Sequence, residues 1–112
     1  MKEVRAVVRP NKLSRLRAAL RDIPGFPGMT VSKVEGFGAP SQHATLTNIR
    51  EQLTDFVPKV RIEIVTEDSM VEAIVERIVA VAGTGQIGDG LVWVTGVERA
   101  VFIYKTGAPA RD

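Results

Sequence analysis

A strand–helix–strand pattern that occurs twice restricts the fold of this chain more than any other feature. Each copy begins with a segment in which apolar and polar residues alternate, as in a half-buried strand, over residues 1–9 and 57–65. Apolar residues three and four positions apart then indicate a helix, and a further strand closes each copy over residues 29–35 and 91–95. Two such units predict an α+β domain with a ferredoxin-like split βαβ (βαββαβ) sheet and both helices on one face.

The helix boundaries carry signals of their own. Asn11 is the expected N-cap of the first helix, and Thr66 or Asp68 is the expected N-cap of the second. Gly83 suits the position just after the second helix. The stripes predicted to be buried are Leu13, Leu16, Leu20 and Ile23 in the first helix, and Val71, Ile74, Val75, Ile78, Val79 and Ala82 in the second.

The end of the chain is expected to add one more element. Residues 100–104 predict an extra C-terminal strand, and residues 106–112 a loose tail. The preceding strand is apolar on both faces, so an oligomer is expected, with Trp93 in the core or at a subunit interface. With 112 residues, the chain is expected to form a single domain over residues 1–112.

Composition argues against several classes of protein. Because 15 cations face 13 anions, no basic stripe for nucleic acid is expected. The absence of cysteine excludes thiolate chemistry and favours a cytoplasmic protein. No apolar run approaches the roughly 20 residues that span a bilayer, so no membrane insertion is expected. No nucleophile–base pair or paired carboxylates point to an enzyme.

Residues 83–90 form a glycine-rich segment between the second predicted helix and its following strand. Four glycines in eight residues allow tight turns, and successive N–H groups in such a loop can form a nest for an anion. Phosphate loops of the Walker and dinucleotide types run from strand to helix instead, so this segment is neither. Two interpretations remain open at this point: a plain helix-to-strand turn, or an anion site.

Five segments, in order, resemble the P-II signal-transduction family over nearly the whole chain. They are VVRP with KL at residues 7–13, GMTVS at 28–32, GFG at 36–38, DFVPKV at 55–60 and TGQIGDG at 84–90. The form FPGMT at residues 26–30 further resembles a divergent branch whose genes tend to lie beside heavy-metal efflux pumps.

The resemblance implies a homotrimer that binds ATP or ADP in clefts between subunits and acts as a regulator, not an enzyme. Residues 38–55 correspond to the T-loop, which docks onto a target membrane transporter or cytosolic enzyme. Residues 83–90 correspond to the B-loop, which cradles phosphates. Family members report nucleotide ratios, and often 2-oxoglutarate, through the conformation of the long loop.

The resemblance also implies site residues. Thr30, Glu63 and Val65 match an adenine and ribose pocket, and Lys59 matches a lysine that faces phosphate or 2-oxoglutarate. The full nucleotide-binding set is Val8, Thr30, Gly36, Phe37, Gly38, Lys59, Glu63, Val65, Gly88, Asp89 and Gly90. The partner-binding set in the long loop is Pro40, Gln42, His43, Thr45, Leu46, Asn48, Arg50 and Gln52.

Departures from the family pattern modify these expectations. Leu91 replaces a lysine, and Phe102 and Tyr104 stand where two arginines are expected. Ala39 and Pro40 replace an Arg-Gln pair that holds Mg²⁺ and helps to seat 2-oxoglutarate, and Gln52 stands at the position of the tyrosine that many members uridylylate. We therefore expect a weakened phosphate site for ADP, AMP, ATP or a cyclic nucleotide, without Mg²⁺ or 2-oxoglutarate.

Alternatives remain for the function. If the chain is not a nucleotide-sensing regulator, it is a ligand-free interaction trimer or a metal-linked regulator beside an efflux system. An RNA-binding domain ranks below both alternatives. His43 is the only histidine and is expected to be a solvated loop residue rather than a metal ligand. Arg5, Arg9 and Arg15 are expected on a solvated face or in trimer contacts.

Overall fold

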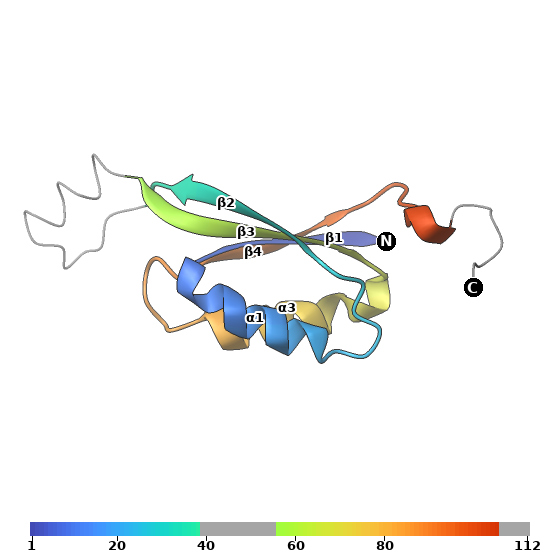
Figure 1. The fold of residues 1–112 in the computed structure, drawn as a ribbon, viewed down its shortest axis with the longest axis horizontal. Helices are drawn as coiled ribbons and strands as arrows, with labels where there is room; N and C mark the ends of the chain where they lie inside the picture. The colour runs from blue at the N-terminus through green and yellow to red at the C-terminus, as the bar shows by residue number, and fades with distance from the viewer. Residues whose placement is uncertain (39–55, 106–112) are drawn as a thin grey trace, which may run out of the picture.

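The computed structural model describes residues 1–38 and 56–105, which form one antiparallel sheet with two helices on one face (Figure 1). The strands are β1 (Lys2–Val8), β2 (Thr30–Gly36), β3 (Val57–Thr66) and β4 (Gly90–Gly96), in the order β2-β3-β1-β4. The helices are α1 (Leu13–Arg21) and α3 (Val71–Ala82). This is the predicted split βαβ arrangement. Residues 39–55 of the predicted long loop and the predicted tail, residues 106–112, lie outside the described residues.

Strand β1 fixes the register because it pairs with both β3 and β4. At its end, Val8 is opposite Val60 on one side and Gly90 on the other. Directly opposed residues of antiparallel strands share a face. The register therefore brings the start of β4 and the first half of β3 to the same end of the sheet.

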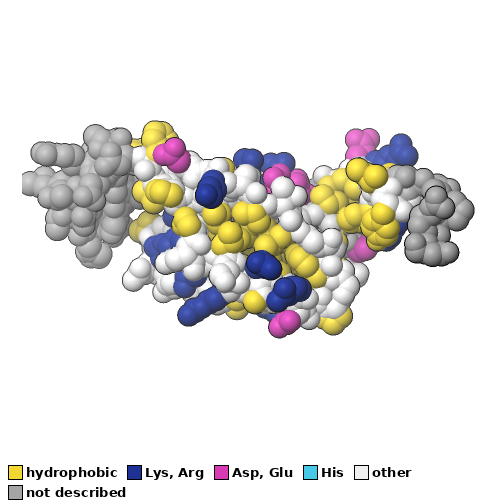
Figure 2. Space-filling model, in the orientation of Figure 1, with side chains coloured by type: hydrophobic (Ala, Val, Ile, Leu, Met, Phe, Trp, Pro, Cys, Tyr) yellow, Lys and Arg dark blue, Asp and Glu magenta, His cyan; other side chains and the backbone are white. Residues whose placement is uncertain are grey.

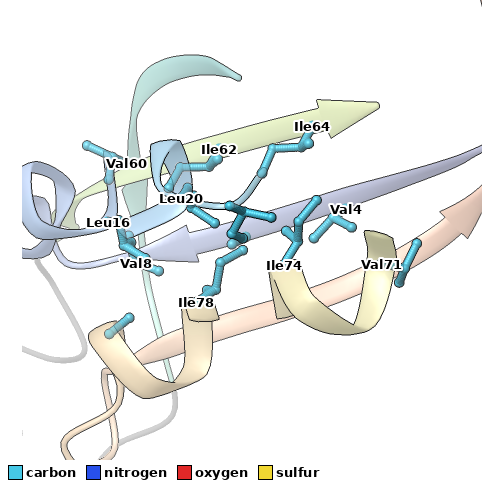
Figure 3. Close-up of a cluster of buried hydrophobic side chains, with 13 residues drawn as sticks. Val4, Val8, Leu16, Leu20, Val60, Ile62, Ile64, Val71, Ile74 and Ile78 are labelled. Atoms are coloured by element: carbon cyan, nitrogen blue, oxygen red, sulfur yellow. The ribbon is translucent and has the colours of Figure 1, made fainter. Parts of the chain in front are cut away.

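The helix-facing side of the sheet and the two helices form the core (Figure 3). Val4, Ala6 and Val8 of β1 are at most 2% exposed, as their alternation predicts. The buried set is completed by Leu16, Leu20, Ile23, Val60, Ile62, Ile64, Val71, Ile74, Ile78 and Ala82, while Leu13 and Val75 are partly buried. Each fully buried aliphatic side chain contributes roughly 1.5–3 kcal/mol relative to exposure.

Val79 is the exception in the predicted buried stripe of α3, since its side chain is 55% exposed. It lies near the C-terminal end of the helix, one residue after the fully packed Ile78. Successive residues of a helix point about 100° apart, and with Ile78 directed at the sheet, Val79 lies at the exposed edge of the stripe. The prediction that Val79 is buried is wrong for the single chain.

The predicted N-caps are also wrong. A 3₁₀ turn precedes each helix, η1 (Pro10–Lys12) before α1 and η2 (Asp68–Met70) before α3, and no side chain caps either helix. Asn11 lies inside η1, and Thr66 is the buried last residue of β3. Backbone carbonyls close these turns instead, and the Asp68 carboxylate is 3.0 Å from the N-terminal amino group.

The predicted extra strand at residues 100–104 does not form in the single chain. Residues 97–102 follow β4 as an irregular segment, and Ile103–Lys105 form the 3₁₀ turn η3, which lies beyond the end of the sheet in Figure 1. Strand β4 is the edge of the described sheet and pairs only with β1. An added strand would need a pairing partner that the described part of one chain does not supply.

Candidate functional site

The glycine loop, residues 83–90, connects α3 to β4 and depends on glycine at two of its positions. A Cβ on Gly90 would lie 1.8 Å from the Val7 carbonyl oxygen, and this residue has φ of +114°. A Cβ on Gly83 would lie 2.7 Å from the Val79 oxygen, although its φ of −79° is ordinary and it does not form the left-handed cap that glycine commonly supplies. Close backbone approach therefore requires glycine at both ends of the loop.

Asp89 occupies the concave side of the loop. Its Oδ2 accepts hydrogen bonds from the N–H groups of Thr84, Gly85 and Gln86 at 2.6, 2.9 and 3.3 Å. The Thr84 hydroxyl donates to Oδ1 at 2.5 Å. These bonds, led by that of the Thr84 side chain, lower the pKa of Asp89 to about 2. The segment does form a nest of N–H groups, and its anion in this chain is the carboxylate of Asp89.

Arg9 and Lys59 attach the glycine loop to the sheet. Arg9 Nη1 is 3.0 Å from Asp89 Oδ1, and Arg9 Nη2 donates to the Ile87 carbonyl oxygen at 3.3 Å. Lys59 Nζ donates to the Gly88 carbonyl oxygen at 2.6 Å. Burial lowers the pKa of Lys59, the nearby Arg9 guanidinium lowers it further, and Asp89 opposes both. Two cations therefore contact the loop.

Arg9 was not among the predicted site residues, since the sequence placed it only on a solvated face or in a trimer contact. The signal that identifies it is the register of β1 and β4. Val8 is opposite Gly90, so the residues that follow and precede them, Arg9 and Asp89, are brought close together. Predicting this contact requires knowing which strands are neighbours in the sheet.

A hollow of about 200 Å³ lies beside the glycine loop. It unites three predicted site residues, Val8, Asp89 and Gly90, with apolar side chains of α3 and β4. The remaining lining residues are Ile78, Val79, Ala82, Gly83, Leu91 and Val92. Asp89 is the one ionisable residue of this lining.

A second hollow, of about 540 Å³, brings together the residues predicted to hold adenine and ribose. Thr30, Glu63 and Val65 line it, and Thr30 is directly opposite Glu63 across β2 and β3. Glu3, Pro27, Gly28, Met29 and Phe102 complete the lining. We call this the Thr30 hollow. The sequence had not singled out Glu3 for it, and had noted Phe102 only as a missing arginine.

The Thr30 hollow and the glycine loop are separate places in one chain. Lys59, which bonds to the loop, and Val65, which lines the hollow, are six residues apart on β3. At about 3.3 Å per residue, Lys59 is about 20 Å from Val65 and about 13 Å from Glu63, which also lines the hollow. Most of the predicted nucleotide-binding residues therefore form two separate groups along β3.

The other predicted residues lie around the base of the long segment. A Cβ on Gly36 would be 3.4 Å from Lys59 Cγ, so Gly36 adjoins the glycine-loop group. The Phe37 ring packs against Phe56 with centroids 5.9 Å apart and lines neither hollow. Gly38 is the last described residue before the gap. All predicted partner-binding residues, Pro40, Gln42, His43, Thr45, Leu46, Asn48, Arg50 and Gln52, lie outside the described residues.

Within the described ranges 1–38 and 56–105, no group of three or more His, Cys, Asp or Glu side chains could hold a metal ion. No helix in the same ranges is long and apolar enough to cross a membrane.

Comparison with known proteins identifies the family. Residues 1–107 match the family model described as nitrogen regulatory protein P-II. The chain belongs to the P-II family. It is 44% identical to the nitrogen regulatory protein P-II of Azospirillum brasilense and 43% identical to that of Haemophilus influenzae, over 100% of this chain and 98% of each relative. The Escherichia coli K12 nitrogen regulatory protein P-II 1 is 44% identical over 96% of this chain and 94% of that protein.

Membership confirms the resemblance drawn from the five sequence segments. The chain is a P-II signal-transduction regulator, and its described sheet and helices are consistent with the ferredoxin-like fold expected of the family. The ligands of the glycine loop and the Thr30 hollow, the assembly and the target remain predictions.

Proposed function

We propose that this P-II protein is a homotrimeric regulator that senses an adenine nucleotide between subunits. It controls a membrane transporter or cytosolic enzyme through residues 38–55, without catalysing a reaction itself. This segment signals to the target whether a nucleotide is bound. It begins close to Gly36, whose neighbour Lys59 bonds to the glycine loop.

The separation of the two residue groups carries this proposal. The Thr30 hollow supplies a hydroxyl, carboxylates and apolar walls, which suit a base and a ribose. The glycine loop brings the Arg9 and Lys59 cations together, which suit phosphates, while three of its N–H groups already bind the Asp89 carboxylate. Along β3, Lys59 is about 13 Å from Glu63 and about 20 Å from Val65, the two residues of this strand that line the hollow. A cleft between two subunits would let one nucleotide contact the hollow of one chain and the loop of its neighbour.

The proposed phosphate site is weak. Leu91 is 65% exposed where the family pattern has a lysine, and Phe102 and Tyr104 carry no positive charge. A charge-assisted hydrogen bond contributes roughly 1.5–3 kcal/mol, so three missing contacts reduce triphosphate affinity by several orders of magnitude. Mg²⁺ and 2-oxoglutarate are therefore not part of the proposal.

Calorimetric titration with ATP, ADP, AMP and cyclic AMP, each with and without Mg²⁺ and 2-oxoglutarate, tests the nucleotide site. We expect micromolar binding of at least one nucleotide. Thr30→Ala should weaken it, whereas Ser14→Ala on the exposed side of α1 should not. Absence of heat with every nucleotide would favour the alternative of a ligand-free interaction trimer, which Leu91, Phe102 and Tyr104 motivate.

Removal of residues 40–52 tests the role of the long segment. The truncated protein should no longer capture its target, because this segment is the proposed docking element, and the mass of the assembly should be unchanged apart from the deletion. Pull-down from cell extract together with light scattering measures both properties. Target capture that survives the deletion would contradict the proposed role of the segment.

A further inference from the structure

The lining of the Thr30 hollow combines carboxylates with apolar walls. Its polar lining consists of the Glu3 and Glu63 carboxylates and the Thr30 hydroxyl, and its lining residues include no lysine or arginine within the described chain. The other walls are apolar or backbone, from Pro27, Gly28, Met29 and Val65, together with the ring of Phe102. Such a lining accepts hydrogen bonds from a ligand and offers no cation to a phosphate.

The two carboxylates form ion pairs with arginines of the same sheet face. Arg5 Nε is 3.0 Å from Glu3 Oε1 and 3.5 Å from Glu63 Oε2, and Arg61 Nε is 3.8 Å from Glu63 Oε1. The Glu3 and Glu63 side chains remain 18% and 27% exposed. Their charge is thus partly balanced from the sheet, while their exposed surface can still accept N–H groups of a neutral ligand.

Phe102 is the one aromatic residue in the lining of this hollow. Its ring packs against Tyr104 with centroids 6.3 Å apart and an interplanar angle of 51°, and Lys105 Nζ lies 5.5 Å from the Phe102 centroid. These neighbours support the ring at the edge of the hollow (for the position of this segment see Figure 1). A supported aromatic ring is a stacking surface for a planar base.

We propose that Phe102 is a specificity-determining residue that stacks on the base of the bound nucleotide. The Thr30 hollow then selects a planar heteroaromatic ring with an exocyclic amine, which donates to Glu63 or Glu3. Because an aromatic ring replaces a cation, binding energy moves from the phosphates to the base. Adenosine and AMP therefore bind nearly as well as ATP. This inference rests on the proposed nucleotide site and names the ligand class of that site.

Titration of adenosine and ATP into the full-length chain tests this inference. We expect the unmodified protein to bind the two within about tenfold of each other. Phe102→Ala should weaken adenosine about 5- to 150-fold, the range measured for loss of base–aromatic stacking. Phe102→Tyr should restore the affinity, and Phe102→Arg should raise the preference for ATP over adenosine. Val101→Ala is the control in the same segment, since Val101 is 49% exposed and does not line the hollow.

The outcomes separate this inference from the proposed function. If the unmodified protein binds ATP and Phe102→Ala leaves adenosine and ATP affinities unchanged, Phe102 has no role in binding, and the nucleotide site itself stands. If the unmodified protein binds none of the probes, the nucleotide site is refuted and this inference with it. Far-ultraviolet circular dichroism of each variant separates a loss of stacking from a loss of fold.

Discussion

Asp89 shapes the glycine loop from within, because its carboxylate accepts three backbone N–H groups and the Thr84 hydroxyl. Its pKa falls from 3.8 to about 2, so the unfolded chain binds the proton more tightly than the folded one. The stabilisation from the ionised carboxylate is therefore complete above about pH 4 and is lost as the pH falls toward 2.

Urea denaturation between pH 2 and 6 measures this effect. The midpoint should rise as the pH increases through the window from 2 to 4, and Asp89→Asn should flatten that part of the profile. Asp22→Asn serves as control because Asp22 is exposed at the end of α1. An Asp89→Asn profile parallel to that of the unmodified protein would show that these hydrogen bonds do not stabilise the folded loop.

Gly90 and Gly28 allow a matched test of close backbone approach. Their φ values are +114° and +108°, but a Cβ would meet the Val7 oxygen at 1.8 Å only at Gly90 and would meet nothing within 4 Å at Gly28. Gly28→Ala should cost about 1–3 kcal/mol from backbone strain alone. Gly90→Ala should cost clearly more, because β1 and β4 must separate. Equal losses in chemical denaturation would contradict this account.

At the scale of elements, the sequence predicts what local patterning determines. The four strands and two helices follow from alternation and from spacings of three and four, and the structure confirms them within a few residues. The N-caps were missed because backbone carbonyls close η1 and η2 in place of side chains. Residues 100–104 have strand-like composition, but a strand also requires a partner, which local sequence does not specify.

The same limit applies to the candidate site. The resemblance identified Thr30, Glu63 and Val65, and the structure places them in one hollow. Arg9 and Phe102 escaped prediction because each reaches its site from a distant part of the chain, 80 positions from Asp89 in one case. Such contacts depend on strand order, not on spacing along the sequence.

Two residues of the predicted apolar stripe of helix α3 differ in their burial in the structure. Ile74 and Val79 both belong to the predicted stripe, yet Ile74 is fully buried and Val79 is 55% exposed. Ile74→Ala should lower the free energy of unfolding by about 2–5 kcal/mol. Val79→Ala should change it by no more than about 0.5 kcal/mol. A large loss at Val79 in urea denaturation would indicate that another chain covers this face of α3.

At the scale of the whole molecule, exposed apolar side chains gather beside the two segments outside the described residues and on the edge strand β4. Exposed apolar side chains include Phe37, Phe56 and Val57 beside one undescribed segment, and Val101 and Tyr104 beside the other, and Figure 2 shows hydrophobic side chains next to both. Leu91 and Val94 add exposed apolar area on the edge strand β4. Surface of this kind commonly marks contacts with another chain.

Light scattering coupled to size exclusion tests the assembly directly. The expected mass is three times the 12.2 kDa of one chain. Val94→Lys should shift the population toward monomer, because it places a charge on the apolar edge, while Lys33→Ala on the opposite edge strand β2 should not. A mass of one chain for the unmodified protein at micromolar concentration would exclude the proposed trimer.

The carboxylate of Asp89 makes the glycine loop a receptor that carries its own ligand on a short tether. The carboxylate is three to five residues from the N–H groups that it binds, so it competes for them at a high effective concentration. An external phosphate that used the same three N–H groups would first have to displace the Asp89 carboxylate. Its apparent affinity would therefore be lower than for a loop whose N–H groups were free.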